Sequence, residues 1–207
     1  MLKFSHLKIF ILSVLLSAPA LADEPARYSP FLSGPLGLNI IPSARMDKTG
    51  AVRASISTQD PYLHGSLGFQ IAEPLYIAFR QTAETSSLKD EAERLYPGID
   101  IKLRLLKETR TLPDIAIGMQ SAFGHKRMAG EYLALSKRLG HFDITGGLGW
   151  GRFGSAAHIK NPLRHISSHF EKNRIDQEMP NDITNWFTGP HIGFFGGVEY
   201  FTPIEGL

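Results

Sequence analysis

Apolar and polar residues alternate one by one through the middle of the chain, most clearly between Gly98 and Gly151. Every second residue from Ile99 to Leu105 is apolar, and the run from Phe142 to Thr145 repeats the pattern. A period of two is typical of β-strands that have one apolar and one polar face. The pattern predicts about eight strands, at 52–57, 64–71, 75–81, 98–106, 114–122, 130–139, 142–151 and 194–201.

These strands predict an all-β fold, an antiparallel meander, with two possible environments for its apolar face. In a soluble β-sandwich the apolar face turns inward against a second sheet. In an outer-membrane-type β-barrel it turns outward to lipid, and the polar face lines a lumen. The periodicity alone fits both.

The connections between the predicted strands favour the membrane alternative. Long and short gaps tend to alternate, as they do in outer-membrane barrels with long outer loops and tight periplasmic turns. The gaps after odd-numbered strands are 58–63, 82–97, 123–129 and 152–193, and the gaps after even-numbered strands are 72–74, 107–113 and 140–141. The last strand ends close to residue 207, which predicts a small or incomplete barrel.

The alternation also assigns residues to the two faces. Leu103 and Ile144 are expected to face lipid. Lys137 shares the phase of the apolar residues around it, so we expect it near a membrane interface, where its stem can reach water. The candidate lumen-facing residues are Arg80, Asp100, Lys102, Arg104, Asp143 and Glu199.

The first 22 residues have the pattern of a secretory signal peptide. Lys3 and Lys8 flank an apolar stretch at 9–16, and Ala20-Leu21-Ala22 predicts cleavage after Ala22. Residues 23–51 form a Pro/Gly-rich lead-in, and 52–207 form the predicted barrel portion with its long loop at 152–193. No later stretch is apolar over the roughly 20 residues that a membrane-spanning helix needs.

Charge and cysteine content exclude several classes of function. The formal net charge is +2 with both signs scattered along the chain, which gives no field suited to nucleic acid. Cysteine is absent, which excludes disulfides, thiolate chemistry, cysteine-ligated zinc and lipid attachment through an N-terminal cysteine.

Catalytic and metal sites have little support in the sequence. His158, His165 and His169 fall in one segment, but the glutamate of a zinc-protease helix is missing, so no metal site is predicted. Asp100 and Asp143 would suit glycoside hydrolysis if they faced one another, yet neighbouring cations indicate a solvated polar wall. No nucleotide, dinucleotide or hydrolase fingerprint is present, and we expect no enzyme activity and no cofactor.

The long segment 152–193 mixes basic and aromatic residues that suit contacts with sugars. Its length exceeds that of an ordinary connection, which favours a binding role. The candidate polysaccharide contacts are Arg152, Lys160, Arg164 and Trp186.

Several stretches from Gly37 onward together carry a resemblance to a known family. They are 37–46 with Gly50, 101–108 with Leu112-Pro113, 131–138, 142–152, and 195–200 ahead of Thr202-Pro203. In their order and spacing the chain resembles the N-terminal part of the YjbH family, outer-membrane proteins associated with exopolysaccharide and group 4 capsule operons. The resemblance implies an outer-membrane β-barrel that helps to export or assemble polysaccharide, without established enzymatic residues. Members of that family are several times longer, and some are lipoproteins.

We therefore expect a non-enzymatic outer-membrane β-barrel protein that contributes to exopolysaccharide or capsule export, as a truncated member of the family. Its expected partners are outer-membrane lipid, polysaccharide and other proteins of an exopolysaccharide operon. The first alternative is a soluble periplasmic β-sandwich that binds polysaccharide or an assembly partner, and the second is a periplasmic glycan-modifying enzyme.

Overall fold

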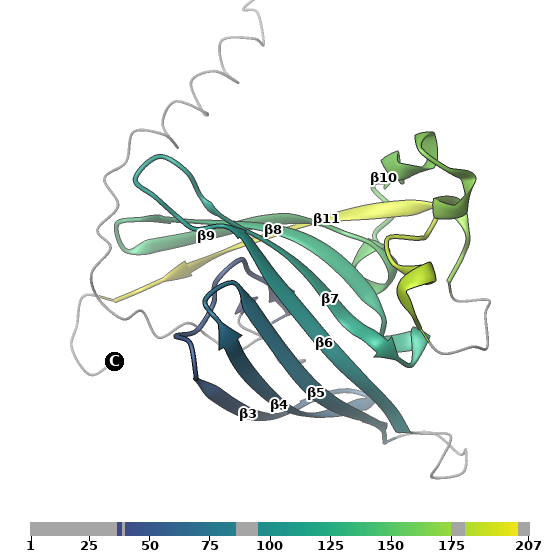
Figure 1. Cartoon of the computed structure of the whole chain (residues 1–207), viewed down its shortest axis with the longest axis horizontal. Helices are drawn as coiled ribbons and strands as arrows, with labels where there is room; N and C mark the ends of the chain where they lie inside the picture. Colours follow the sequence, from purple (N-terminus) through teal and green to yellow (C-terminus); the bar gives the residue numbers. More distant parts are fainter. Residues whose placement is uncertain (1–36, 39, 86–94, 175–180, 203–207) are drawn as a thin grey trace, which may run out of the picture.

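The computed structural model describes residues 37–38, 40–85, 95–174 and 181–202 (Figure 1). The predicted signal peptide 1–22 and most of the predicted lead-in, residues 23–36 and 39, lie outside these described residues.

One antiparallel sheet of nine strands dominates the structure, in the order β10-β11-β9-β8-β7-β6-β5-β4-β3. The predicted all-β meander is therefore confirmed, and each of the eight predicted strands is present. The strands of the sheet are β3 (Val52–Gln59), β4 (Tyr62–Ala72), β5 (Leu75–Glu84), β6 (Leu95–Leu106), β7 (Asp114–Gly124), β8 (Gly130–Leu139), β9 (Phe142–Gly149), β10 (Ile159–Lys160) and β11 (His191–Tyr200).

The segment predicted as a long loop at 152–193 contains more regular structure than a plain loop. It holds the short edge strand β10 and several 3-10 helices, and β11 begins earlier than expected, at His191. The 3-10 helices of the described chain are η2 (Lys126–Met128), η3 (Gly151–Gly154), η4 (Pro162–His165), η5 (Ser168–Glu171) and η6 (Ile183–Asn185).

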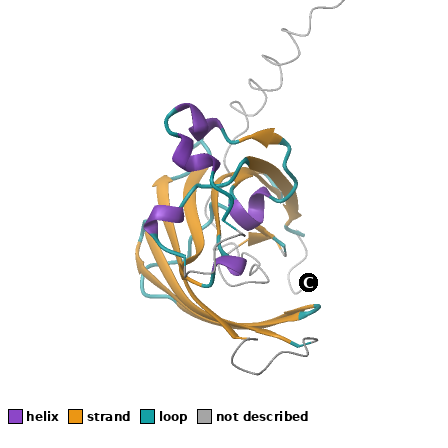
Figure 2. Cartoon of the chain, turned by 90° about the vertical axis from the view of Figure 1, so that its right-hand side faces the viewer, coloured by secondary structure: helices purple, strands orange, loops and turns teal. Residues whose placement is uncertain are grey.

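The sheet is strongly curved but does not close into a barrel. Its two edges are β3 and β10, which do not pair with one another. Figure 2 shows the strong bend of the strands. Of the two predicted forms, a small barrel and an incomplete one, the described sheet has the incomplete form.

The connections follow the predicted alternation of long and short gaps only in part. The predicted gap at 58–63 is a two-residue turn at Asp60-Pro61, because β3 and β4 stay paired as far as Gln59 and Tyr62. Strands β5, β7 and β9 end at this same end of the sheet and are followed by longer connections, so we call it the long-connection end. At the opposite end, which we call the short-turn end, lie the connections 73–74, 107–113 and 140–141.

Burial across the sheet is the reverse of that in a soluble protein. On the convex face large apolar side chains are exposed, with Ile56 83% and Phe79 57% accessible. On the concave face polar side chains are buried, with Lys102 1% and Thr82 0% accessible. The apolar residues that are buried are mostly alanine and tyrosine, not the branched aliphatic residues of an ordinary core.

The described part of the lead-in fills the hollow of the sheet. Strand β1 (Gly37–Leu38) pairs with β2 (Ile41–Pro42), and the residues that follow run along the concave face. Ala44 is fully buried against a cluster from β7 and β8, and Met46 is buried against Tyr76 and Ala78 of β5. The lead-in thus supplies core that the sheet cannot make alone.

Candidate functional site on the concave face

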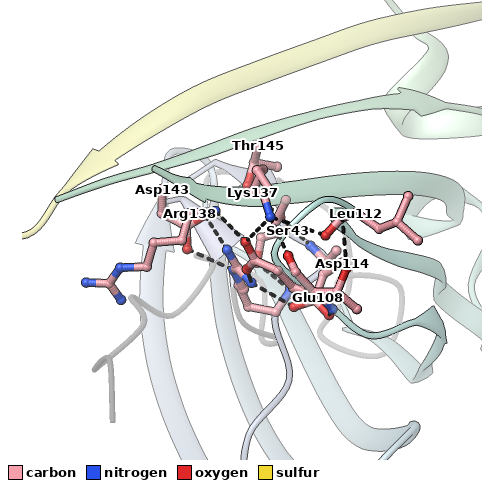
Figure 3. A network of polar contacts seen from close by, with 12 residues as sticks. Ser43, Glu108, Leu112, Asp114, Lys137, Arg138, Asp143 and Thr145 are labelled. Carbon is pink, nitrogen blue, oxygen red and sulfur yellow. Dashed lines mark hydrogen bonds and ion pairs between the residues drawn. The ribbon is translucent and has the colours of Figure 1, made fainter. Parts of the chain in front are cut away.

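At the short-turn end of the concave face, the guanidinium of Arg45 is buried among three carboxylates, those of Glu108, Asp114 and Asp143 labelled in Figure 3. Its Nε and Nη2 donate to the two oxygens of Asp143, each at 2.8 Å, and its Nη1 donates to Asp114 at 2.8 Å and to Glu108. Asp143 belongs to β9, Asp114 begins β7, and Glu108 lies in the turn between β6 and β7. One arginine from the lead-in therefore joins three separate parts of the sheet at its short-turn end.

Main-chain contacts fix the same segment from both sides. The Ala44 N–H donates to Ser136 Oγ of β8 at 2.9 Å, and Ser136 shares a hydroxyl–hydroxyl bond of 2.7 Å with Thr145 of β9. On β6, the Lys102 amine donates to the Arg45 carbonyl oxygen. Because the backbone as well as the side chain is held, residues 44 and 45 have a fixed position on the sheet.

Lys137 also belongs to this cluster, and its amine is held by protein groups at the short-turn end of the sheet, where its stem was expected to reach water. Its amine lies 3.1 Å from Glu108 and donates to main-chain carbonyl oxygens of the 107–113 turn. The residue lies two positions before the end of β8, so its long stem can fold over the adjacent turn. The charge is thereby neutralised by protein.

A second charged pair lies further along the concave face. Arg80 Nε and Nη2 donate to the carboxylate of Asp100 at 3.0 and 3.1 Å, and the Ser121 N–H donates to the same carboxylate at 2.7 Å. Both side chains are almost fully buried. A buried pair whose hydrogen bonds are satisfied in this way is stable as a unit and intolerant of losing one partner.

Comparison with known proteins assigns the chain to a family. A family model named YjbH, described as "Exopolysaccharide biosynthesis protein YbjH", matches residues 32–207. This chain belongs to the YjbH family. It is also 35% identical over 194 residues to the "Uncharacterized lipoprotein YjbH" of Escherichia coli (strain K12), and the match covers 88% of this chain. No solved structure matches it significantly.

The matched region includes the Arg45 cluster and all described strands. Membership of the YjbH family supports a role in exopolysaccharide processes. The chain spans 28% of the length of the Escherichia coli relative, so the activity of that whole protein is not carried by the comparison. Among the described residues, no helix has the length and apolar character to cross a membrane.

The six candidate lumen-facing residues of this YjbH-family chain all lie on the concave face. Arg80, Asp100, Lys102 and Asp143 are buried there. Arg104 lies 3.5 Å from Asp114 and 3.7 Å from Glu73. Glu199 of β11 stands opposite Asp143 of β9 in the strand register.

The structure does not bring Asp100 and Asp143 together as an acid–base pair. They lie on β6 and β9, with β7 and β8 between them, which corresponds to about 14 Å across the sheet. Each carboxylate is also engaged by its own arginine. A glycosidase pair would need its carboxyl groups about 5 to 9.5 Å apart around one bond.

The four candidate sugar contacts lie in different surroundings. Arg152 in η3 lines a cavity at the long-connection end, whereas Lys160 in β10 is exposed and Arg164 in η4 is half-exposed. Trp186 anchors the long segment to β7, because its Nε1 donates to the Ala122 carbonyl at 3.0 Å and its ring contacts Phe123. Only Arg152 of the four lines that cavity.

The three histidines of the long segment do not converge. His158 accepts a hydrogen bond from the Phe194 N–H at 2.8 Å, and His169 contacts the Thr184 carbonyl. Within the described ranges no group of histidine and carboxylate side chains is arranged to hold a metal.

Sequence reasoning missed the residues that organise both ends of the sheet. Arg45 belongs to a recognised motif, but the lead-in has no periodicity that would place it on a strand. Glu131 was also missed, although its sequence position gives a signal. It is a charged residue at a position of β8 where the alternation calls for an apolar one. It is fully buried because Arg174 covers it, with Nη1 2.7 Å from Glu131 Oε1.

Proposed function

We propose that this chain forms part of the wall of an outer-membrane β-sheet protein that takes part, without catalysing a reaction, in the export or assembly of exopolysaccharide. The observation that carries the proposal is the reversed burial of the sheet, apolar outside and polar inside. A soluble sandwich of the same strands would hide its apolar face in a core. Here that face is open to the surroundings, which favours lipid.

The size of the exposed apolar surface supports a lipid environment. Soluble monomers rarely expose contiguous apolar patches of more than a few hundred Å². On this sheet every strand from β3 to β9, together with β11, contributes exposed large apolar residues on the convex side. They include Val52, Ile56, Leu67, Phe79, Leu103, Leu105, Phe123, Leu135, Ile144 and Val198.

The open edges fit the same environment if further strands complete the wall. Unpaired backbone N–H and C=O groups cost several kcal/mol each in hydrocarbon, so spanning sheets are closed. The edges β3 and β10 therefore need partners in the membrane. We propose that these are other strands of a longer family member or of an assembly partner.

The Arg45 cluster supports one orientation. It lies at the short-turn end, and in outer-membrane barrels short turns face the periplasm. A chain that enters from the periplasm would meet this end first, which is where the lead-in is anchored. The long-connection end, with Arg152 and η2 to η6, would then face outward and meet polysaccharide or lipid headgroups.

The comparisons support an envelope location without specifying the membrane. The Escherichia coli relative is called a lipoprotein, and the family is named for exopolysaccharide biosynthesis. An envelope protein with a polar inner wall is suited to act as a scaffold or conduit for a hydrophilic polymer. The other partners in this proposal are outer-membrane lipid and proteins of the same pathway.

Single-cysteine labelling tests the proposal directly, because the chain contains no cysteine of its own. Phe79→Cys places a thiol on the convex face, and Leu112→Cys places one in a turn at the short-turn end. With a membrane-impermeant maleimide, we expect Leu112→Cys to be labelled only after the periplasm is opened. Phe79→Cys should remain unlabelled until detergent is added.

Fractionation of the same cells can also contradict the proposal. Recovery of the chain in the soluble periplasm without detergent, with Phe79→Cys labelled there, would reject the membrane wall in favour of a soluble protein. Strain-matched measurement of secreted exopolysaccharide then tests the pathway separately from the location.

A further inference from the structure

A cavity of about 770 Å³ lies at the long-connection end, the end that faces the viewer in Figure 2. It is formed where η2, η3 and the chain around residues 173–174 and 188–191 meet. This volume lies in the range of small-molecule binding sites. Neither the comparisons nor the Arg45 cluster assigns a role to it.

Positive charge dominates the lining of the cavity. Its charged members are Lys126, Arg127, Arg152 and Arg174, accompanied by His125 and His191, and no aspartate or glutamate is among its described lining residues. An enclosed surface with one sign of charge raises the local concentration of ions of the opposite sign. The lining therefore favours an anionic ligand.

Two of these cations are already engaged by carboxylates elsewhere. Arg174 binds both oxygens of Glu131, and Arg127 lies 3.6 Å from Glu84. Arg152 differs, because no carboxylate of the described residues lies within ion-pair distance of it. Its Nη1 contacts only a thioether, that of Met128, at 3.8 Å. The surplus charge is thus centred on Arg152.

The surroundings of Arg152 leave its charge incompletely compensated. Burial lowers the pKa of the Arg152 guanidinium and the neighbouring charge of Arg80 lowers it further, while Tyr62 and Asp100 oppose these effects. An anion bound in the cavity would favour the charged guanidinium, because opposite charge stabilises the protonated form. Lys126 adds a second positive charge to the same lining.

The remaining lining is suited to a sugar more than to a single inorganic anion. Ser155 and Asn173 carry hydroxyl and amide groups that can bond sugar hydroxyls. Ala157 and Pro190 provide small apolar surfaces that can lie against a sugar ring. Such a mixture over several hundred Å³ exceeds what one phosphate ion would use.

We propose that this cavity binds an acidic saccharide, a sugar unit that carries a carboxylate, with Arg152 as its principal anchor and Lys126 as its second cation. A guanidinium can hold a carboxylate through two parallel hydrogen bonds, which a neutral sugar cannot match. This proposal rests on the proposed function, which supplies the source of the saccharide. It extends that function by naming the class of polymer that the long-connection end would meet.

Calorimetric titration of the detergent-extracted full chain tests the site. The probe is trigalacturonate, and the comparison ligands are the neutral maltotriose and inorganic phosphate. We expect trigalacturonate to bind and Arg152→Gln to weaken it about tenfold or more, the effect of losing a charge-assisted hydrogen bond. Lys126→Gln should weaken it as well. Arg164→Gln removes a basic residue of the same segment that does not line the cavity, and it should change nothing.

Each contrary result rejects the assignment. No binding of trigalacturonate, equal binding of maltotriose, or equal loss in Arg164→Gln overturns it, and equal competition by phosphate assigns the cavity to small anions instead. Should Arg152→Gln fail to fold by circular dichroism, Arg152→Lys, which keeps the charge but loses the planar fork, takes its place and must also weaken binding. A chain that inserts in the membrane but binds nothing rejects the saccharide site alone, whereas soluble behaviour in the labelling experiment rejects the proposed function.

Discussion

Arg45 and Asp143, 98 residues apart in the sequence, are joined by two parallel hydrogen bonds of 2.8 Å each. The pair holds the lead-in against β9, next to the 140–141 turn that joins β8 to β9. Both partners are buried, so the guanidinium has no access to water as a substitute. The lead-in and the sheet are therefore expected to order together.

Replacing Arg45 by methionine tests this dependence. The substitution leaves the buried carboxylate of Asp143 without its cation and leaves Asp114 with Arg104 alone, at 3.5 Å. Losing one partner of a buried pair costs about 3 to 5 kcal/mol. We expect urea unfolding in detergent to show a loss of that size and limited proteolysis to release the lead-in first.

The matched control is Arg53→Met. Arg53 pairs with Asp47 at 3.0 Å, but the two side chains are 30% and 21% exposed. A solvated pair of this kind contributes about 1 kcal/mol or less. Equal losses for the two variants would contradict a special role for Arg45.

A close approach between Gly118 and Tyr132 predicts a second effect. The two residues are partners across β7 and β8, and a Cβ built at 118 would lie 2.1 Å from the Tyr132 ring. Gly118→Ala should therefore force the ring aside at a cost of about 1 to 3 kcal/mol in unfolding free energy. The cost should shrink when Tyr132 is also replaced by alanine.

Gly146→Ala is the control for this prediction. A Cβ there would meet nothing closer than the Phe195 carbonyl oxygen at 3.9 Å. A Gly118→Ala protein as stable as Gly146→Ala would show that the tyrosine ring does not need the glycine surface.

The strands were predictable because alternation is a local signal. From Ile99 to Leu105 the polarity of each residue predicts the face of the sheet on which it lies, and burial in the structure alternates in the same way. The position of Arg45 was not predictable in the same way, because its partners come from three distant parts of the chain. The two-residue turn at Asp60-Pro61 was missed because the polar residues Thr58 and Gln59 conceal the continued pairing of β3 with β4.

The part of the candidate site that lies on strands was predictable, because the alternation of polar and apolar residues shows which face each side chain occupies. Lys102 and Asp143 were assigned to the polar face by alternation, and they lie there. The Glu131–Arg174 pair was not, because an ion pair between β8 and an irregular segment 43 residues later leaves no periodic trace. The cavity lining depends on such irregular segments, so Lys126 and Arg127 also escaped notice.

Asn161 holds the long segment together and gives a third prediction. Its Nδ2 donates to the carbonyl oxygens of Phe170, Phe187 and Gly189, and its Oδ1 accepts from Trp150 Nε1 at 3.1 Å. Asn161→Asp would turn the donor group into an anion facing carbonyl oxygens. Unsatisfied buried groups of this kind cost about 1 to 3 kcal/mol each.

Hydrogen exchange read by mass spectrometry measures the result. Amide exchange in peptides from 159–174 should accelerate by at least tenfold, while β6 and β7 stay protected. Asn185→Asp alters a solvent-facing bond to Asp182 and should leave the segment unchanged. Uniform acceleration through the whole sheet would show that the segment is not an independent unit.

A charge on the convex face separates lipid from water as its neighbour. Phe79 lies in the middle of β5 and is open to its surroundings, so in a bilayer Phe79→Arg would place a guanidinium among acyl chains. At mid-bilayer such a change costs about 2 to 4 kcal/mol, whereas on a water-exposed face it removes an unfavourable apolar surface and costs nothing. We expect Phe79→Arg to lower the amount of chain recovered in the outer membrane, and Leu112→Arg, in the 107–113 turn, to leave it unchanged. Normal membrane recovery of Phe79→Arg, or improved solubility without detergent, would place the convex face in water or against another protein and would remove the main support for a membrane wall.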